Sequence, residues 1–133
     1  MIQLKKCLKL FVTALLLTIF SEIFAQSFPV VRIPVEKRNF TSSTIENEIA
    51  AMQQKIKDPE LAWMFANCFP NTLDRTVNFT TTNGKANTFV ITGDIFAMWL
   101  RDSSAQVWPY LPFMQQDKKL QQLIAGVKNR QIK

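Results

Sequence analysis

Residues 76–92 read TVNFTTTNGKANTFVIT and contain two runs of β-prone residues. The first run, 76–82, is rich in threonine, and the second, 88–92, reads TFVIT. Asn83 and Gly84 lie between them, and both readily adopt the positive φ that a tight hairpin turn needs. We therefore predict a β-hairpin near residues 76–92, with the segment KAN at 85–87 lengthening its loop and Gly93 ending the second strand.

A helix is predicted before this hairpin, ending near Lys57. Ser43 and Glu46 have the spacing of a capping box, in which each side chain binds a free backbone N–H at the start of a helix. Apolar residues then recur at spacings of three and four, which is typical of a helix with one buried face. These residues are Ile45, Ile49, Met52 and Ile56.

A second helix is predicted to begin at Asp58-Pro59. Asp58 suits the N-cap, and proline is tolerated at the first helical position because no hydrogen bond is lost there. Pro70 and Asn71 are expected to end the helix. Its inner face is predicted to consist of Leu61, Met64, Phe65 and Cys68. Cys68 is therefore expected to be a buried, inert thiol.

Two further helices are predicted after the hairpin. Asp102 or Ser103 can cap a short one that accommodates Pro109. Asp117 can cap another with an apolar stripe, formed by Leu120, Leu123, Ile124 and Val127. The chain is thus predicted to be mainly α-helical.

The first 25 residues have the pattern of a secretory signal peptide. Lys5, Lys6 and Lys9 precede an apolar run of about eleven residues, which is short for a membrane span of roughly 20. Ala25 is a plausible cleavage point. We predict a signal peptide at 1–25, an exported domain at 26–133, a periplasmic or extracellular location and no stable membrane span after cleavage. The alternative is an uncleaved N-terminal anchor.

The composition excludes several classes of chemistry. The chain has no histidine, so it cannot hold a Ser-His-Asp nucleophile or an imidazole metal site. Two cysteines are too few for a four-cysteine zinc site. Carboxylates, amides, hydroxyls, arginine and aromatic rings remain for chemistry. The net charge is +6, but the basic residues near the end form no clustered motif, so no nucleic-acid partner is expected.

Residues 92–111, TGDIFAMWLRDSSAQVWPYL, carry the side chains that a sugar-binding cleft needs. Asp94, Arg101 and Asp102 can hold sugar hydroxyls through charge-assisted hydrogen bonds. The ring of Trp99 can cover the apolar face of a pyranose, and a few converging polar groups fix its orientation. The alternative is that the Arg-Asp pair caps a helix and the tryptophans belong to the core.

Four blocks of the sequence resemble the N-terminal part of glycoside hydrolase family 125, the metal-independent exo-α-1,6-mannosidases of bacteria and fungi. The resemblance extends from about Thr44 to Gln131. The blocks are FANCFPNTLD at 65–74, FVITGDI at 89–95, AMWLRDS at 97–103 and QVWPYL at 106–111. One departure is Phe96, where the family pattern has proline. Proline would stiffen this turn, and phenylalanine is expected to loosen it.

The resemblance implies an incomplete (α/α)6 barrel with a β-hairpin near residues 76–92. It implies inverting hydrolysis of terminal α-1,6-linked mannose in mannan or N-glycans, so the expected partner is an α-mannoside oligosaccharide. It also implies that no metal or cofactor is needed. One carboxylic acid protonates the leaving oxygen and a carboxylate activates water. In the family these two groups lie further along the sequence than residue 133, so no catalytic residue is assigned. Asp94, Trp99, Arg101 and Asp102 are assigned to substrate binding.

Three interpretations of the whole chain remain at this point. It is an N-terminal piece of an exported mannosidase, without activity alone, or a small secreted carbohydrate-binding or interaction module, or an exported structural protein. The predicted last helix reaches Lys133 without a C-cap signal, which favours the first interpretation. The sequence does not indicate an oligomeric state.

Overall fold

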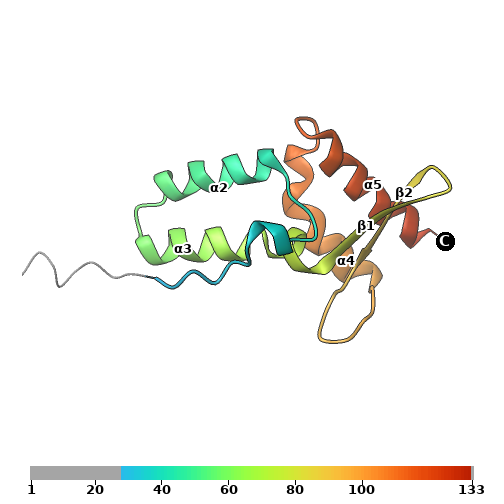
Figure 1. The fold of residues 1–133 in the computed structure, drawn as a ribbon, viewed down its shortest axis with the longest axis horizontal. Helices are drawn as coiled ribbons and strands as arrows, with labels where there is room; N and C mark the ends of the chain where they lie inside the picture. The colour runs from blue at the N-terminus through green and yellow to red at the C-terminus, as the bar shows by residue number, and fades with distance from the viewer. Residues whose placement is uncertain (1–27, 133) are drawn as a thin grey trace, which may run out of the picture. The chain divides into compact units, whose positions relative to one another are not determined.

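The computed structural model describes residues 28–132. The predicted signal peptide lies outside these residues. Residues 31–133 form one compact unit. Its elements, shown in Figure 1, are η1 (Val35–Lys37), α2 (Ser43–Lys55), α3 (Pro59–Cys68), η2 (Thr72–Thr76), β1 (Val77–Thr82), β2 (Lys85–Val90), α4 (Leu100–Val107), η3 (Trp108–Phe113) and α5 (Lys118–Gln131). The unit is mainly helical with a small two-stranded antiparallel sheet, as predicted.

The predicted hairpin is confirmed, with a tighter turn than expected. Strand β1 pairs with β2 from Val77 opposite Val90 to Thr82 opposite Lys85. Asn83 and Gly84 form the whole turn, with φ values of 52° and 73°. A two-residue turn of this hand matches the twist of the strands, so residues 85–87 join β2 instead of lengthening the loop.

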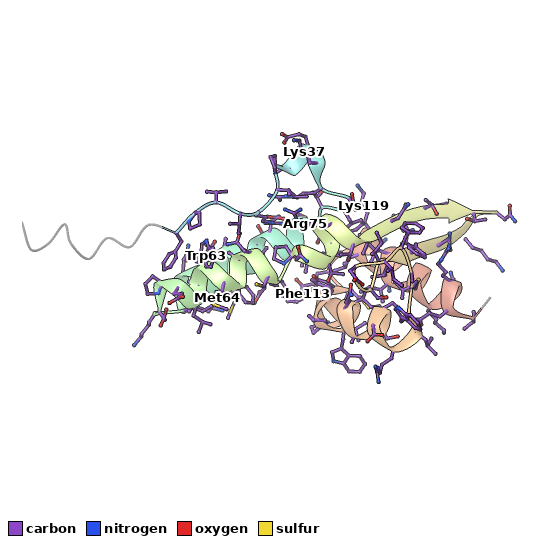
Figure 2. The ribbon with its side chains drawn as sticks, turned by 90° about the horizontal axis from the view of Figure 1, so that it is seen from below. Lys37, Trp63, Met64, Arg75, Phe113 and Lys119 are labelled. Carbon is purple, nitrogen blue, oxygen red and sulfur yellow. The ribbon has the colours of Figure 1, made fainter. Side chains whose placement is uncertain are left out.

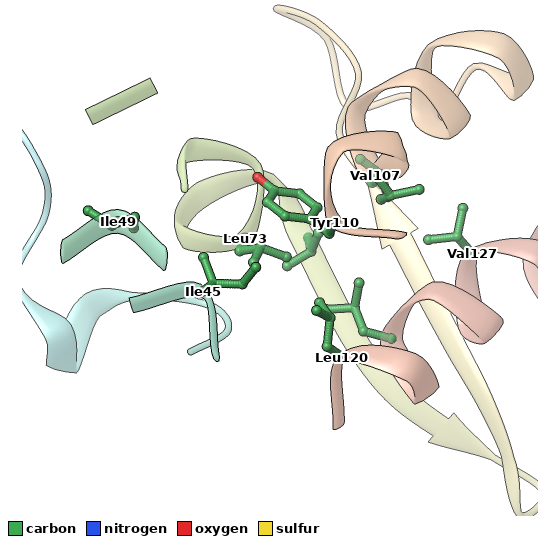
Figure 3. Packing of buried hydrophobic residues seen from close by; sticks show 10 residues of the cluster. Ile45, Ile49, Leu73, Val107, Tyr110, Leu120 and Val127 are labelled. Atoms are coloured by element: carbon green, nitrogen blue, oxygen red, sulfur yellow. The ribbon is translucent and has the colours of Figure 1, made fainter. Parts of the chain in front are cut away.

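Helix α5 packs across β2 and holds the hairpin to the core. Asp117 caps it as predicted, with its Oδ1 accepting from the backbone N–H of Lys119 (2.9 Å) and Leu120 (3.0 Å). The predicted stripe is confirmed, because Leu120, Leu123 and Val127 are buried and Ile124 packs against them. Figure 3 shows Leu120 and Val127 among the side chains of the core.

Helix α2 begins one residue earlier than the capping box predicted. Its N-cap is Ser42, whose Oγ accepts from the N–H of Ile45 at 3.2 Å. Ser42 also donates to Asp117, which joins the caps of α2 and α5. Glu46 does not accept the backbone hydrogen bond of a capping box, because its carboxylate accepts hydrogen bonds from Arg32 and Arg38 instead. The capping-box prediction was therefore wrong, and α2 ends at Lys55.

Helix α3 begins as predicted, with Asp58 as N-cap and Pro59 in the first turn. The predicted inner face was right for Phe65 and wrong for its other three residues. Leu61, Met64 and Cys68 are exposed, so Cys68 is not a buried thiol. The face that turns inward is shifted around the helix axis and consists of Ala62, Phe65, Ala66 and Phe69. Both stripes have helical spacing, and packing against α2 and η3 decides between them.

Helix α4 begins after Trp99, so neither Asp102 nor Ser103 caps it. The chain then continues as the 3-10 helix η3, which accommodates Pro109 in its first turn. Tyr110 of η3 is almost completely buried and donates its hydroxyl hydrogen to the carbonyl of Phe69. This contact joins η3 to the end of α3. No helix among residues 28–132 is long and apolar enough to cross a membrane.

Burial raises the pKa of the Tyr110 hydroxyl to about 12. The folded chain therefore keeps this proton where an unfolded chain would release it near pH 10. The stability that this proton contributes is present below pH 10 and is lost as pH rises through about 12. Tyr110 is the only tyrosine in the chain, so tyrosinate absorbance reports on it alone. We expect a titration midpoint near 12 in buffer and near 10 in concentrated denaturant. Equal midpoints would contradict the burial.

Candidate functional site

Residues 91–99 form a closed loop between β2 and α4, and Thr92 fastens its two ends. The backbone N–H of Thr92 donates to the carbonyl of Ala97 at 3.1 Å, and its Oγ1 donates to the same oxygen at 3.2 Å. The N–H of Trp99 donates back to Thr92 Oγ1 at 3.1 Å. The side chain of one threonine therefore fixes where α4 begins relative to the strand.

The four residues predicted to bind sugar all lie on or just after this loop and are accessible to solvent. Asp94 is exposed at its tip, and Trp99 is 58% exposed at its end. Arg101 and Asp102 lie in the first turn of α4, with side chains 92% and 44% exposed and Arg101 Nε 3.8 Å from Asp102 Oδ1. Among the described residues, no hydrogen bond joins Asp94 to the other three.

The alternative for these residues was that the Arg-Asp pair caps a helix and that the tryptophans belong to the core. No side chain caps α4, so the Arg-Asp pair is not a helix cap. Trp99 and Trp108 are both more than half exposed, so neither is a core residue. The structure thus presents an indole ring, a guanidinium and two carboxylates to solvent within one short segment.

Gln131, the last residue of α5, hydrogen-bonds to the first turn of α4. Gln131 Nε2 donates to Ser103 Oγ (2.8 Å), to Ser104 Oγ (3.0 Å) and to the carbonyl of Leu100 (3.1 Å). Ser103 is fully buried. Gln131 therefore positions the turn that carries Arg101 and Asp102. Sequence reasoning missed this role, because the partners are 27 to 31 residues apart and leave no local pattern.

Phe96 is also held in place, in contrast to the expected loosening of this turn. Its ring stacks on Phe89 with centroids 4.7 Å apart, and the guanidinium of Arg130 lies 4.8 Å from the centroid of Phe89. Phe96 is nevertheless 80% exposed. The loop therefore carries a supported aromatic ring beside Asp94.

A second group of charged residues was not predicted, and all of its members except Glu46 are largely buried. Arg32 Nε donates to Asp74 Oδ2 at 2.6 Å, and its Nη1 and Nη2 donate to the two oxygens of Glu46 at 2.8 and 2.6 Å. Arg38 donates to Glu46 at 3.2 Å and lies 3.7 Å from Asp74. These four residues form the arginine–carboxylate cluster. It ties the lead-in segment, residues 31–42 before α2, to α2 and η2.

The cluster shifts the pKa values of its members in opposite directions. Hydrogen bonding from Arg32 lowers the pKa of Glu46 despite partial burial. Burial lowers the pKa of Arg32, but its bonds to Asp74 and Glu46 outweigh this effect and raise it above its usual value. Asp74 accepts hydrogen bonds from Arg32 and is paired with Arg38 at 3.7 Å, so its side chain serves the fold. Residues 28–132 contain no cluster of acidic or cysteine side chains suited to hold a metal ion.

Comparison with known proteins gives two matches to this chain. The family model described as metal-independent alpha-mannosidase (GH125) matches residues 58–133, which include the loop at 91–99 and all of α4. The Meiotically up-regulated gene 157 protein of Schizosaccharomyces pombe is 40% identical over 102 residues. That alignment covers 72% of this chain and 20% of the yeast protein. The chain thus spans about a fifth of the length of this relative.

Proposed function

Because the chain belongs to the metal-independent alpha-mannosidase family, glycoside hydrolase family 125, we propose that it serves the removal of terminal α-1,6-linked mannose from mannan or N-glycans. In this proposal residues 26–133 form the N-terminal part of an (α/α)6 barrel. Residues 1–25 direct export, and the protein acts in the periplasm or outside the cell on an α-mannoside oligosaccharide, without a cofactor.

The observation that carries the proposal is the solvent-facing group on the loop at 91–99 and the first turn of α4. Asp94, Arg101 and Asp102 offer two carboxylates and a guanidinium, which bind vicinal hydroxyls through charge-assisted hydrogen bonds. Trp99 offers an aromatic face for the C–H side of the sugar ring. We assign these four residues to the subsite that holds the terminal mannose.

Neither carboxylate of this group is assigned as the acid or the base. An inverting glycosidase needs two carboxyl groups roughly 6.5–9.5 Å apart on opposite faces of the scissile bond, and the acid needs a raised pKa. Asp102 is 44% exposed and its Oδ1 lies 3.8 Å from Nε of Arg101, so its oxygens are open to hydroxyl groups from solvent. Hydroxyl binding is therefore the role that suits it.

The proposal is tested by binding and hydrolysis of α-1,6-mannobiose. We expect calorimetry to detect weak binding to the chain. Replacing Arg101 with methionine should weaken it at least tenfold, because a hydrogen bond to a charged group contributes about 1.5–3 kcal/mol. Lys128→Met removes an exposed cation from α5, outside the loop, and should leave binding unchanged. Equal affinity of the Arg101→Met variant and the unmodified chain would contradict the assigned subsite.

Hydrolysis is the separate part of this test. No described residue is assigned as acid or base, so the 133-residue chain is expected to bind the disaccharide without releasing mannose. Release of mannose by the purified chain, lost in an Asp94→Asn or Asp102→Asn variant, would show that these carboxylates catalyse rather than bind.

A further inference from the structure

A pocket of about 340 Å³ lies beside α3, and the loop at 91–99 contributes no residue to it. Helix α3, the π-helical turn η2 and the lead-in segment at 31–32 line it, and no lining residue comes from residues 91–108. In Figure 2, Trp63 lies on α3 and Arg75 lies beyond the end of that helix, with the lead-in running alongside. The volume is within the range of small-molecule sites.

Four polar or aromatic side chains of this pocket are spaced four residues apart in the sequence. They are Trp63, Asn67, Asn71 and Arg75. In an α-helix of 3.6 residues per turn, a four-residue step exceeds one turn. In η2 the N–H of Val77 bonds to the carbonyl of Thr72, five residues back, so a four-residue step there falls short of one turn. The two offsets oppose each other and keep all four side chains on the pocket.

The π-helical turn is a second indication that this surface has a role. Such turns are rare and are found frequently at functional sites. Here the turn also places Asp74 inward, where it binds Arg32, and Arg75 outward. One turn therefore builds both the buried floor and the exposed edge of the pocket.

The charges around the pocket favour a neutral ligand. Arg32 and Asp74 are both lining residues, and they neutralise each other at 2.6 Å. Arg75 is exposed, and its guanidinium has no hydrogen bond or ion pair with the described residues. A single free cation is a poor site for a phosphate, for which several donors usually converge. Asn67 donates its amide hydrogen to the carbonyl of Trp63 at 2.7 Å, and its amide oxygen accepts no hydrogen bond from the described residues.

We propose that this pocket binds one neutral hexose unit of a glycan, as an accessory subsite separate from the loop at 91–99. Trp63 lies against the C–H face of the sugar. Asn71 and Arg75 donate to its hydroxyl groups, and Asn67 accepts from one. The proposal does not require the loop to bind sugar, although the family's glycan substrates make a second sugar subsite useful for holding a branched chain.

Trp63 supplies the signal for a direct test. The chain has three tryptophans, so replacing Trp99 and Trp108 with phenylalanine leaves Trp63 as the only indole. This background also weakens the loop site. We expect methyl α-mannoside to change the fluorescence in a saturable way. Arg75→Met in the same background should raise the Kd about tenfold. Lys128→Met removes an exposed cation of α5 that belongs neither to the pocket nor to the loop at 91–99, and it should leave the Kd unchanged.

Each outcome of this titration decides the matter. A saturable signal that Arg75→Met weakens and Lys128→Met does not supports the pocket. No saturable signal, or one that Arg75→Met leaves unchanged, overturns it. Binding of inorganic phosphate in preference to the mannoside also overturns it. If Arg75→Met unfolds the chain, as judged by circular dichroism, Asn71→Ala takes its place with an expected rise in Kd of about threefold. Failure here leaves the assignment of Arg101 untouched, because that is measured with all three tryptophans present.

Discussion

Replacing Asp74 with asparagine is expected to lower the free energy of unfolding by about 3 kcal/mol, measured by urea denaturation. The side chain of Asp74 is only 3% exposed, and it accepts two hydrogen bonds from Arg32. The amide that replaces it carries no charge and points N–H groups at an arginine that already donates. Arg32 would then remain largely buried with only one of its two carboxylate partners, Glu46. Breaking a buried pair from one side costs far more than breaking an exposed one.

The exposed pair of Arg101 and Asp102 provides the matched control. Asp102→Asn makes the same chemical change at a site where the partner is 92% exposed and 3.8 Å away. Its effect on stability should stay below about 0.5 kcal/mol, since exposed pairs contribute little. Similar losses in the two variants would show that the arginine–carboxylate cluster does not tie the lead-in to the core as described.

Gly126→Ala is expected to destabilise the chain by about 2 kcal/mol, which corresponds to roughly 10 °C in melting temperature. A Cβ on Gly126 would come within 2.3 Å of Thr88 Oγ1, 2.9 Å of the Thr88 nitrogen and 3.0 Å of the Asn87 nitrogen. Two of these atoms belong to the backbone of β2 and cannot move independently. Thr88 Oγ1 also donates to the carbonyl of Leu123 at 2.7 Å, and this bond would be strained. The gain of about 1 kcal/mol in helix propensity is too small to compensate.

Gly93→Ala is the control for this substitution. A Cβ there would meet no atom within 4 Å, and the backbone is not in the left-handed region. We expect a change within about 0.5 kcal/mol. If Gly126→Ala were as well tolerated as Gly93→Ala, α5 could not lie as close to β2 as the structure places it.

The parts of the fold that local signals specify were predictable from the sequence. Asn83-Gly84 determines a turn by its own φ preferences, and Asp58 and Asp117 cap helices through bonds to residues two or three positions away. The prediction failed where a side chain had two possible partners. Glu46 has the spacing of a capping box, but the guanidinium of Arg32 binds its carboxylate more strongly than a backbone N–H does.

The prediction of the inner face of α3 was mostly wrong for a related reason. Leu61 and Met64 are as apolar as Phe65 and Ala66, so periodicity alone does not choose between the two stripes. The choice is made by α2 and η3, and those contacts join residues far apart in the sequence. The residues proposed to bind sugar, on the loop at 91–99 and the first turn of α4, were selected by their chemistry and by a family resemblance. The role of Gln131 could not be predicted. It hydrogen-bonds to the first turn of α4, and its partners there are 27 to 31 residues away.

The most direct test of the proposed sugar subsite is amide NMR of the chain titrated with α-1,6-mannobiose. We predict saturable shift changes concentrated in residues 92–102, including the indole N–H of Trp99, and we predict that Arg101→Met removes them. Shifts confined to other parts of the chain, or unchanged in the Arg101→Met variant, would contradict the assignment of Asp94, Trp99, Arg101 and Asp102 to mannose binding.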